Sequence, residues 1–516
     1  MKQKSNYFSG QLGFVLAAAG SAVGVGNLWR FPYLAAKDGG GLFLIVYLAL
    51  VLTFGFTLLT SDIAIGRRTQ KSAIGAYGEM HPKWKFLGIL TFLVPVLIMT
   101  YYAVIGGWIT KYALVYVTGQ AGAAAQDGYF MSFITSPVSP VVFALLFMAA
   151  TVLIVYNGVE GGIEKVSKFM MPVLLVLVVV IAGYSLTLKN TDANGVTRTG
   201  LQGFLYFITP HVEGLTVERF LQILLDAMSQ LFFSLSVSMG IMITYGSYVK
   251  KDVNLGKSVN QIELFDTLVA LLAGVMIIPA VYVFSGVEGM GAGPGLMFVS
   301  LPKVFDAMGK AGTFVGALFF LTAIFATLTS CISVLESIVA NCVEIFRTDR
   351  KKTVVVLSVI YLAASAVIAL GYSKFYFELP LPNGSVGQLL DLMDYVSNSV
   401  MMPFIALLST ILIGWVKSPQ YVIGEMERNG ETFRRRGVYT IMIRYIAPVM
   451  MFVLFCSRPE FCPEIQPASR RLAGFCAKQK IFLLYGNLSC YTEKNAGRRA
   501  DGRRRETLSD TARQTL

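Results

Sequence analysis

Residues 22 to 33, AVGVGNLWRFPY, place glycine, asparagine and arginine inside a long apolar run. Polar and ionised groups at membrane depth are costly unless they line a cavity or meet partners, so Asn27 and Arg30 indicate a site within a membrane helix. Pro32 removes a further backbone donor. A helix interrupted here exposes amides at one half-helix end and carbonyls at the other, which bind an anion and a cation respectively. The alternative is that the glycines only permit close packing of neighbouring helices.

Residues 230 to 250, QLFFSLSVSMGIMITYGSYVK, carry a second polar interruption. Three serines alternate with Leu235 and Val237, and Gly240 follows, in the middle of an apolar run. Serine can bond to carbonyls of its own helix, so a locally kinked helix is the alternative here. Two interrupted helices about 210 residues apart are expected in transporters built from inverted five-helix repeats, with substrate and ions at the membrane midplane.

The elements that must position these residues are membrane-spanning helices. Hydrophobic residues make up 55% of the 516 residues and charged residues only 14%, with a mean hydropathy of +0.63. A helix of about 20 apolar residues crosses a bilayer core. The runs are too long and too free of alternation for barrel strands, so we expect an all-α polytopic membrane protein with about 11 spans. The candidate spans are residues 12–36, 41–65, 86–117, 141–157, 166–188, 226–249, 262–285, 312–346, 353–371, 391–416 and, more weakly, 439–456.

Positive charge in the short loops predicts the orientation, because translocation selects against Lys and Arg. These residues cluster before the first span, at residues 67–85 between spans two and three, and at residues 347–352 after the eighth. All three clusters lie on one side when the N-terminus is inside the cell. The net charge of +13 therefore reflects topology, and no basic stretch has the interleaved aromatic residues of a nucleic-acid surface.

Enzyme chemistry is not indicated, because His81 and His211 are too far apart for a metal motif and the chain has no GxSxG, P-loop or HExxH pattern. Residues 457–516 differ in composition from the rest, with 12 Lys or Arg against 6 acids and no apolar run long enough to span. The eleventh candidate has only about twelve uncharged residues before Ser457, short of a full crossing. We interpret the tail as a truncated or frame-shifted end, with ordinary unpaired thiols.

The motif AAAGSAVGVGNLWRFPY followed by GGGLF closely resembles the first helix of the neurotransmitter:sodium symporter family. The resemblance extends through FFSLSVSMG, TYGSY, FATLTSCISVLES and LLDLMDYVSNS, and covers roughly residues 8 to 456. It implies two inverted five-helix repeats with broken first and sixth helices. We expect a cytoplasmic N-terminus (1–11), a first repeat (12–188), an extracellular connection (189–225), a second repeat (226–416), a cytoplasmic loop with a partial eleventh helix (417–456) and the atypical tail (457–516).

The resemblance implies two sodium sites. One lies between the first and eighth helices. Its matching ligands are the carbonyls of Gly20, Val23 and Ala326 and the hydroxyls of Thr329 and Ser330. A hard cation is suited to oxygen ligands, and half-helix ends supply free carbonyls. Without the resemblance, the TLTS sequence would be interpreted as polar helix packing.

The other implied sodium site takes the carbonyl of Ala22 and the side chains of Asn27, Ser234 and Asp266. A buried carboxylate supplies negative charge from within the protein, whereas many animal relatives have neutral residues around this site and rely on chloride. We therefore expect transport without chloride, with Asp266 available to exchange a proton on the return step. The alternative places Asp266 at the cytoplasmic mouth of its helix.

The resemblance also implies an amino-acid substrate held between the two broken helices. Its carboxylate meets the amides around Gly24 and Gly26 and a tyrosine hydroxyl, and its ammonium meets carbonyls near Phe233. The implied substrate-binding residues are Gly24, Val25, Gly26, Ile98, Tyr102, Phe233, Ser234, Ser236, Met239, Ser330 and Val334. This pocket is mostly apolar, so an uncharged, hydrophobic or aromatic amino acid fits best. Ser238 stands where a glycine is expected, and we expect it to narrow the pocket.

The implied outer gate pairs Arg30 with Asp394, and Asp391 is the competing partner one turn away. Phe233 and Tyr102 would form the lid over the substrate. An ion pair bridged by water is made and broken at little cost, which suits a gate.

The implied inner gate contains Tyr248 and Glu344. The family's partner for these residues is an arginine just before the first helix, but position 5 is Ser5. Lys4 or Lys2 can substitute, and because lysine lacks the planar fork of arginine we expect looser inner closure.

The expected function is sodium-coupled secondary active uptake of a neutral, hydrophobic or aromatic amino acid by alternating access, independent of chloride. The expected setting is a bacterial cytoplasmic membrane with the N-terminus inside, and the expected ligands are sodium ions and the amino acid, with no organic cofactor. A homodimer is left open. The alternatives are a non-transporting amino-acid sensor, an inactive truncated transporter, or a sodium-independent exchanger of related architecture.

Overall fold

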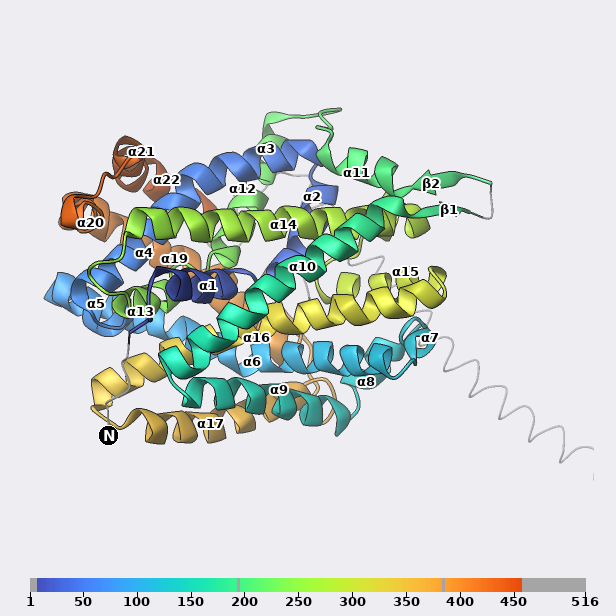
Figure 1. The fold of residues 1–516 in the computed structure, drawn as a ribbon, viewed down its shortest axis with the longest axis horizontal. Coiled ribbons are helices and arrows are strands. Elements are labelled where there is room, and N and C mark those ends of the chain that lie inside the picture. Colours follow the sequence, from blue (N-terminus) through green and yellow to red (C-terminus); the bar gives the residue numbers. More distant parts are fainter. Residues whose placement is uncertain (1–6, 193–194, 383–385, 457–516) are drawn as a thin grey trace, which may run out of the picture. The chain divides into compact units, whose positions relative to one another are not determined.

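The computed structural model describes residues 7–192, 195–382 and 386–456, which form an assembly of helices (Figure 1). The helices considered below belong to one compact unit, residues 7–379 and 387–455. The first ten α-helices are α1 (Gln11–Ala22), α2 (Phe31–Lys37), α3 (Gly41–Leu50), α4 (Phe56–Thr69), α5 (Ala73–Met80), α6 (Lys85–Val117), α7 (Ala121–Ala124), α8 (Tyr129–Ile134), α9 (Ser139–Tyr156) and α10 (Lys165–Thr187).

The strands β1 (Lys189–Thr191) and β2 (Thr197–Thr199) then pair in antiparallel fashion. The helices that follow are α11 (Gly200–Ile208), α12 (Val217–Ser234), α13 (Ile241–Ser247), α14 (Leu255–Ser285), α15 (Leu301–Ala307), α16 (Lys310–Phe346), α17 (Arg350–Leu370), α18 (Leu389–Asp394), α19 (Met402–Ile411), α20 (Gln420–Met426), α21 (Arg436–Ile441) and α22 (Ala447–Cys456). Two short strands, β3 (Leu379–Pro380) and β4 (Val386–Gly387), precede α18.

Short turns of other helix types continue or connect these elements. The π-helical turns are η1 (Gly26–Arg30), η2 (Val51–Gly55), η4 (Val159–Glu164), η6 (Leu296–Ser300), η7 (Tyr395–Met401), η8 (Leu412–Val416) and η10 (Met442–Ile446). The 3₁₀ turns are η3 (Pro82–Trp84), η5 (Val287–Gly289) and η9 (Arg428–Gly430). Turns of the π type are frequent at functional sites.

Ten of the eleven predicted spans have counterparts among the described residues. Within the described ranges, nine helices are long and apolar enough to cross a membrane, and α1 with η1 and α2 makes a tenth span bent by 53°. The last, Arg436–Cys456, is 21 residues long, so the predicted partial helix has the length of a full crossing. The predicted sixth span, residues 226–249, is not among the ten, because α12 and α13 are separated by a link. The count of eleven is therefore not confirmed.

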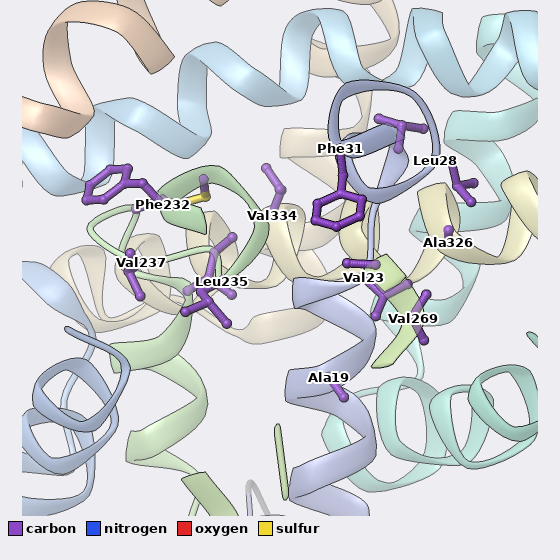
Figure 2. Close-up of a cluster of buried hydrophobic side chains, with 14 of the residues drawn as sticks. Ala19, Val23, Leu28, Phe31, Phe232, Leu235, Val237, Val269, Ala326 and Val334 are labelled. Atoms are coloured by element: carbon purple, nitrogen blue, oxygen red, sulfur yellow. The ribbon is translucent and has the colours of Figure 1, made fainter. Parts of the chain in front are cut away.

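The first interrupted helix breaks immediately after α1. Val23 is extended (φ −74°, ψ 101°), and helical structure resumes at η1. In Figure 2 the ribbon narrows at Val23, and Leu28 and Phe31 lie on the helical turns that follow. Gly26 lies against a ring of the second interrupted helix, because an added Cβ would come within 2.8 Å of Cδ1 of Phe233. The absence of a side chain at this position therefore lets the two interrupted helices touch.

The second interrupted helix breaks between α12 and α13, in residues 235–240, which we call the second link. Ser236, Ser238 and Gly240 have positive φ angles of 52°, 61° and 71°. Glycine adopts this conformation readily, but for serine it is unfavourable, so the two serines need support from outside the link. Leu235 and Val237 lie on this second narrow stretch in Figure 2.

Long helices surround the two breaks and hold them in place. α16 packs along α6 and α1, α14 packs along α10 and α1, and α4 packs along α13. The contact between α4 and α13 depends on Gly66, because an added Cβ would lie 1.9 Å from the carbonyl oxygen of Ile243. Small residues of this kind allow membrane helices to approach closely.

Two predictions fall on parts of the chain outside the described residues. Residues 457–516, interpreted as a truncated or frame-shifted tail, are not among them, and neither are Lys2, Lys4 and Ser5 of the predicted inner gate. Both predictions stay predictions.

Candidate functional site

Five residues predicted to bind one sodium ion lie together where α1 meets α16. The hydroxyl oxygen of Ser330 lies 3.3 Å from the carbonyl oxygen of Gly20, 3.2 Å from that of Val23 and 3.1 Å from that of Ala326. The Thr329 hydroxyl lies 3.1 Å from the carbonyl oxygen of Ala326. The break after α1 frees the first two carbonyls from helical bonding. We call this set the neutral cage, because it gathers only uncharged oxygen ligands.

Three of the four residues predicted for the other sodium site also lie together. Asp266 of α14 accepts hydrogen bonds from Nδ2 of Asn27 at 3.0 Å and from the Ser234 hydroxyl at 2.9 and 3.0 Å. The Ser234 hydroxyl is also 3.3 Å from Oδ1 of Asn27. We call these three side chains the acidic cage. Asp266 is 0% exposed and contacts both interrupted helices, so the alternative placement at the mouth of its helix is wrong.

A small cavity of about 30 Å³ lies between the two interrupted helices. Nine of the eleven predicted substrate-binding residues line it: Gly24, Ile98, Tyr102, Phe233, Ser234, Ser236, Met239, Ser330 and Val334. Ser21, Ala22, Asn27 and Ile241 complete the lining. Val25 and Gly26 are not part of it: Val25 is buried in the hydrophobic core, and Gly26 packs against Phe233. Ala22, the fourth residue predicted for the second sodium site, therefore lines the same cavity as Asn27.

Gly24 is the point where the first break meets the cavity. A Cβ added there would lie 3.0 Å from the Tyr102 hydroxyl and 3.1 Å from the Ser330 hydroxyl. Glycine therefore allows the backbone to approach both groups. The Tyr102 and Ser330 hydroxyls therefore lie close to the backbone of the first break, and both residues belong to the polar part of the cavity lining.

The second link is held by contacts that its own sequence does not reveal. The Ser236 hydroxyl donates to the carbonyl oxygen of Ser21 at 3.0 Å, which ties this link to the first break. The backbone N–H of Ser238 donates to Oδ2 of Asp62 on α4 at 3.0 Å. Asp62 is 3% exposed. Sequence reasoning missed Asp62, although an acid inside an apolar span is a signal for a functional residue.

The predicted outer-gate residues each contact other groups. Nη2 of Arg30 donates to the Ser229 hydroxyl at 2.7 Å. Asp394 accepts from the Tyr101 hydroxyl at 2.9 Å and from Nδ2 of Asn398 at 2.6 Å. Tyr101 and Asn398 were not predicted as site residues, although Tyr101 is next to Tyr102 in the sequence and Asn398 is four positions after Asp394.

The two predicted inner-gate residues, Tyr248 and Glu344, bond to different groups among the described residues. The Tyr248 hydroxyl donates to Glu336 at 2.7 Å, and Glu336 is paired with Arg350 through contacts of 2.5 and 2.7 Å. Glu344 instead accepts from the backbone N–H of Ser72 at 2.7 Å. Glu336 and Glu344 lie on the same helix, α16, eight residues apart, so spacing alone could not decide between them. Sequence reasoning missed Glu336, and the gating role of Glu344 stays a prediction.

Comparison with protein families gives a match to the model described as the sodium:neurotransmitter symporter family, over residues 5–124 and 135–465. An uncharacterized sodium-dependent transporter of Bacillus subtilis, YhdH, is 34% identical over 461 residues, which cover 88% of this chain and 98% of that one. The sodium- and chloride-dependent GABA transporter 2 of Homo sapiens is 24% identical over 467 residues, which cover 80% of this chain and 73% of that one.

Among solved structures, the crystal structure of MhsT in complex with L-phenylalanine resembles this fold with a TM-score of 0.75. The two chains are 34% identical, and the match covers 88% of this chain and 99% of MhsT. The shared fold thus extends over most of this chain.

Proposed function

The chain belongs to the sodium:neurotransmitter symporter family, and we propose that it uses the inward movement of sodium ions to take up a neutral, apolar amino acid. It is a sodium-dependent symporter in a multi-pass membrane family with bacterial members, and this family consists of transporters rather than enzymes. We place it in a bacterial cytoplasmic membrane with its N-terminus inside.

One observation supports this proposal more than any other: the cavity shares its wall with both cages. Asn27 and Ser234 line the cavity and belong to the acidic cage, and Ser330 lines the cavity and belongs to the neutral cage. A cation in either cage therefore lies next to a ligand in the cavity. Each ligand favours the arrangement of the two breaks that the other requires, which couples their binding.

The chemistry of the cavity favours an amino acid with an uncharged side chain. Ile98, Met239 and Val334 supply apolar surface, and charged side chains are missing from the lining. Freed amides near Gly24 and the Tyr102 hydroxyl suit the substrate carboxylate, and carbonyls near Phe233 suit its ammonium. That MhsT was crystallised with L-phenylalanine supports an aromatic or similarly apolar substrate here.

The acidic cage supports transport without chloride. Asp266 carries its own negative charge beside the predicted cation, so no mobile anion is needed to balance it. The human GABA transporter 2, by contrast, is described as sodium- and chloride-dependent. Asp266 can also take up a proton once sodium has left.

Opening and closing would require the two interrupted helices to move against the surrounding long helices. We assign outer closure to Arg30 and Asp394, and inner closure to Tyr248 and Glu344 together with Glu336 and Arg350. Hydrogen bonds already join Tyr248 to Glu336 and Glu336 to Arg350. Each sodium ion gains about 2.3 kcal/mol per 100 mV when it crosses the membrane. Two ions could therefore concentrate a neutral substrate roughly a thousandfold at that potential.

Uptake into proteoliposomes tests the proposed function. The full chain is reconstituted and supplied with radiolabelled amino acids of different size and charge, with an inward gradient of either sodium or potassium. We expect accumulation of apolar amino acids with sodium only. Equal accumulation in potassium would indicate a sodium-independent exchanger, and binding without accumulation would indicate a sensor. Either result would contradict the proposal.

A further inference from the structure

The second link adopts a conformation that its residue types disfavour. Ser236 and Ser238 both have left-handed φ angles, of 52° and 61°, which L-residues other than glycine adopt only with support. Ser236 finds that support at the first break, through its bond to the carbonyl oxygen of Ser21. Ser238 is supported from a different helix, α4, through Asp62.

Asp62 is a buried acid that neither cage uses. It is 3% exposed, it does not line the cavity, and its Oδ2 accepts the backbone N–H of Ser238 at 3.0 Å. Its polar neighbours are engaged elsewhere. The Ser61 hydroxyl is 2.9 Å from the Tyr439 hydroxyl, and the Tyr77 hydroxyl is 2.9 Å from that of Ser409. The Asp62 carboxylate is therefore available as a hydrogen-bond acceptor for the second link.

The bond acts on the cavity because Ser238 lies between two lining residues. Ser236 and Met239 both line the cavity, two positions before and one position after it. Any rotation of the backbone at Ser238 changes where these two side chains point. α4 is also packed tightly on α13 at Gly66, so α4 contacts the second interrupted helix both within the link and just after it.

We propose that Asp62 is a positioning residue for substrate selection: its carboxylate fixes the left-handed turn at Ser238 and thereby sets the wall of the cavity that Ser236 and Met239 form. This inference rests on the proposed function for its meaning in transport. It does not depend on the charge of Asp62. Any oxygen acceptor of the same reach can serve, and a glycine at position 238 makes the acceptor unnecessary.

Four variants of the full-length protein separate these possibilities: Asp62→Ala, Asp62→Asn, Ser238→Gly and the double variant Asp62→Ala with Ser238→Gly. Ser61→Ala is the matched control, since it removes a neighbouring buried hydrogen bond on α4 that does not reach the link. The first readout is equilibrium binding of L-phenylalanine and of smaller apolar amino acids in sodium buffer. The second is amide hydrogen exchange over residues 235–240, which requires no substrate.

We expect Asp62→Ala to weaken L-phenylalanine binding about tenfold, to alter the ranking of large against small amino acids, and to speed exchange in the link. Asp62→Asn should stay within about threefold of the wild type, because its amide oxygen still accepts the bond. The double variant should regain most of the loss, whereas Ser238→Gly and Ser61→Ala should stay near the wild type.

The inference is overturned if Asp62→Ala leaves link exchange unchanged, if Asp62→Asn is as defective as Asp62→Ala, or if glycine at position 238 gives no rescue. A wild-type protein that binds none of the amino acids would contradict the proposed function instead. The exchange comparison would still decide whether Asp62 holds the link.

Discussion

The two cages differ in how they balance a positive charge. The neutral cage gathers backbone carbonyls freed by the first break and two hydroxyls of α16, so a cation there keeps its charge uncompensated. The acidic cage brings together side chains from η1, α12 and α14, and Asp266 would compensate a cation directly. The proposed neutral site would therefore depend on the shape of an interrupted backbone, whereas the proposed acidic site would depend on one ionised side chain in a fixed position.

Removing that charge is expected to have the largest effect. Asp266→Asn should lower sodium-driven uptake at least about 100-fold in chloride-free buffer, because a buried cation then lacks its counter-charge, a loss of about 3 kcal/mol or more. Asp266→Ser should regain uptake when chloride is supplied, because a mobile anion can replace the carboxylate. Radiolabelled uptake in gluconate and in chloride measures both effects. If either variant keeps wild-type uptake without chloride, the acidic cage does not need the charge of Asp266, and the proposed difference between the two cages is wrong.

Trimming the neutral cage should have a smaller effect. Ser330→Ala removes one oxygen of the cage, so we expect the sodium concentration for half-maximal uptake to rise about tenfold, or ~1.4 kcal/mol. Thr327→Ala is the control, since its buried hydroxyl bonds to the carbonyl oxygen of Ala323 on the same helix and not to the cage. Sodium titrations of uptake compare the two. Equal shifts in both variants would mean that α16 was disturbed generally.

The smallest expected effect concerns pH and separates Asp266 from an acid outside the spans. Asp38 follows α2, its side chain is 0% exposed, and it lies 3.0 Å from Arg219. Burial, with a smaller contribution from Asp226, raises the pKa of Asp38 from 3.8 to about 6. The folded protein therefore holds this proton more tightly than the unfolded chain, so stability falls as pH rises between these values.

Asp38→Asn should remove this loss of stability with rising pH. Between the two pKa values, the melting temperature of the wild type should therefore fall by roughly 3 °C relative to that of the variant. Thermal unfolding from pH 4 to 7 measures it in both proteins. If the melting temperature changes with pH equally in both proteins, Asp38 does not contribute to the pH dependence of stability. A pH dependence of uptake that survives Asp38→Asn would then point to Asp266.

Local sequence was sufficient for the first break and insufficient for the second. The first interruption is marked by Gly24, Asn27 and Arg30. Polar and ionised groups are costly inside a packed membrane helix, and the structure breaks at this place. The serines of the second link are compatible with a kinked helix, and the residues they bond to are distant: Ser236 bonds to Ser21 and Ser238 to Asp62, 176 positions away. A contact at that separation leaves no periodic signal in the sequence.

The sixth span and the inner gate show the same limit. The sequence predicts a continuous span over residues 226–249, but the helix is interrupted at residues 235–240. The part before the break, α12, carries Glu218, Arg219 and Asp226 and is not among the candidate crossings of the described residues. Glu336 and Glu344 are both acids on α16, and the pairing of Glu336 depends on where Arg350 of the next helix lies. Residue types identify candidates for such contacts, but the packing of helices selects among them.

The most direct test of the two-cage account is equilibrium binding of L-phenylalanine to the purified protein as sodium is titrated in chloride-free solution. The account predicts no binding in potassium alone and a sigmoidal rise with sodium, which becomes hyperbolic in Ser330→Ala if only the acidic cage still fills. Binding of equal strength in potassium and in sodium would contradict it.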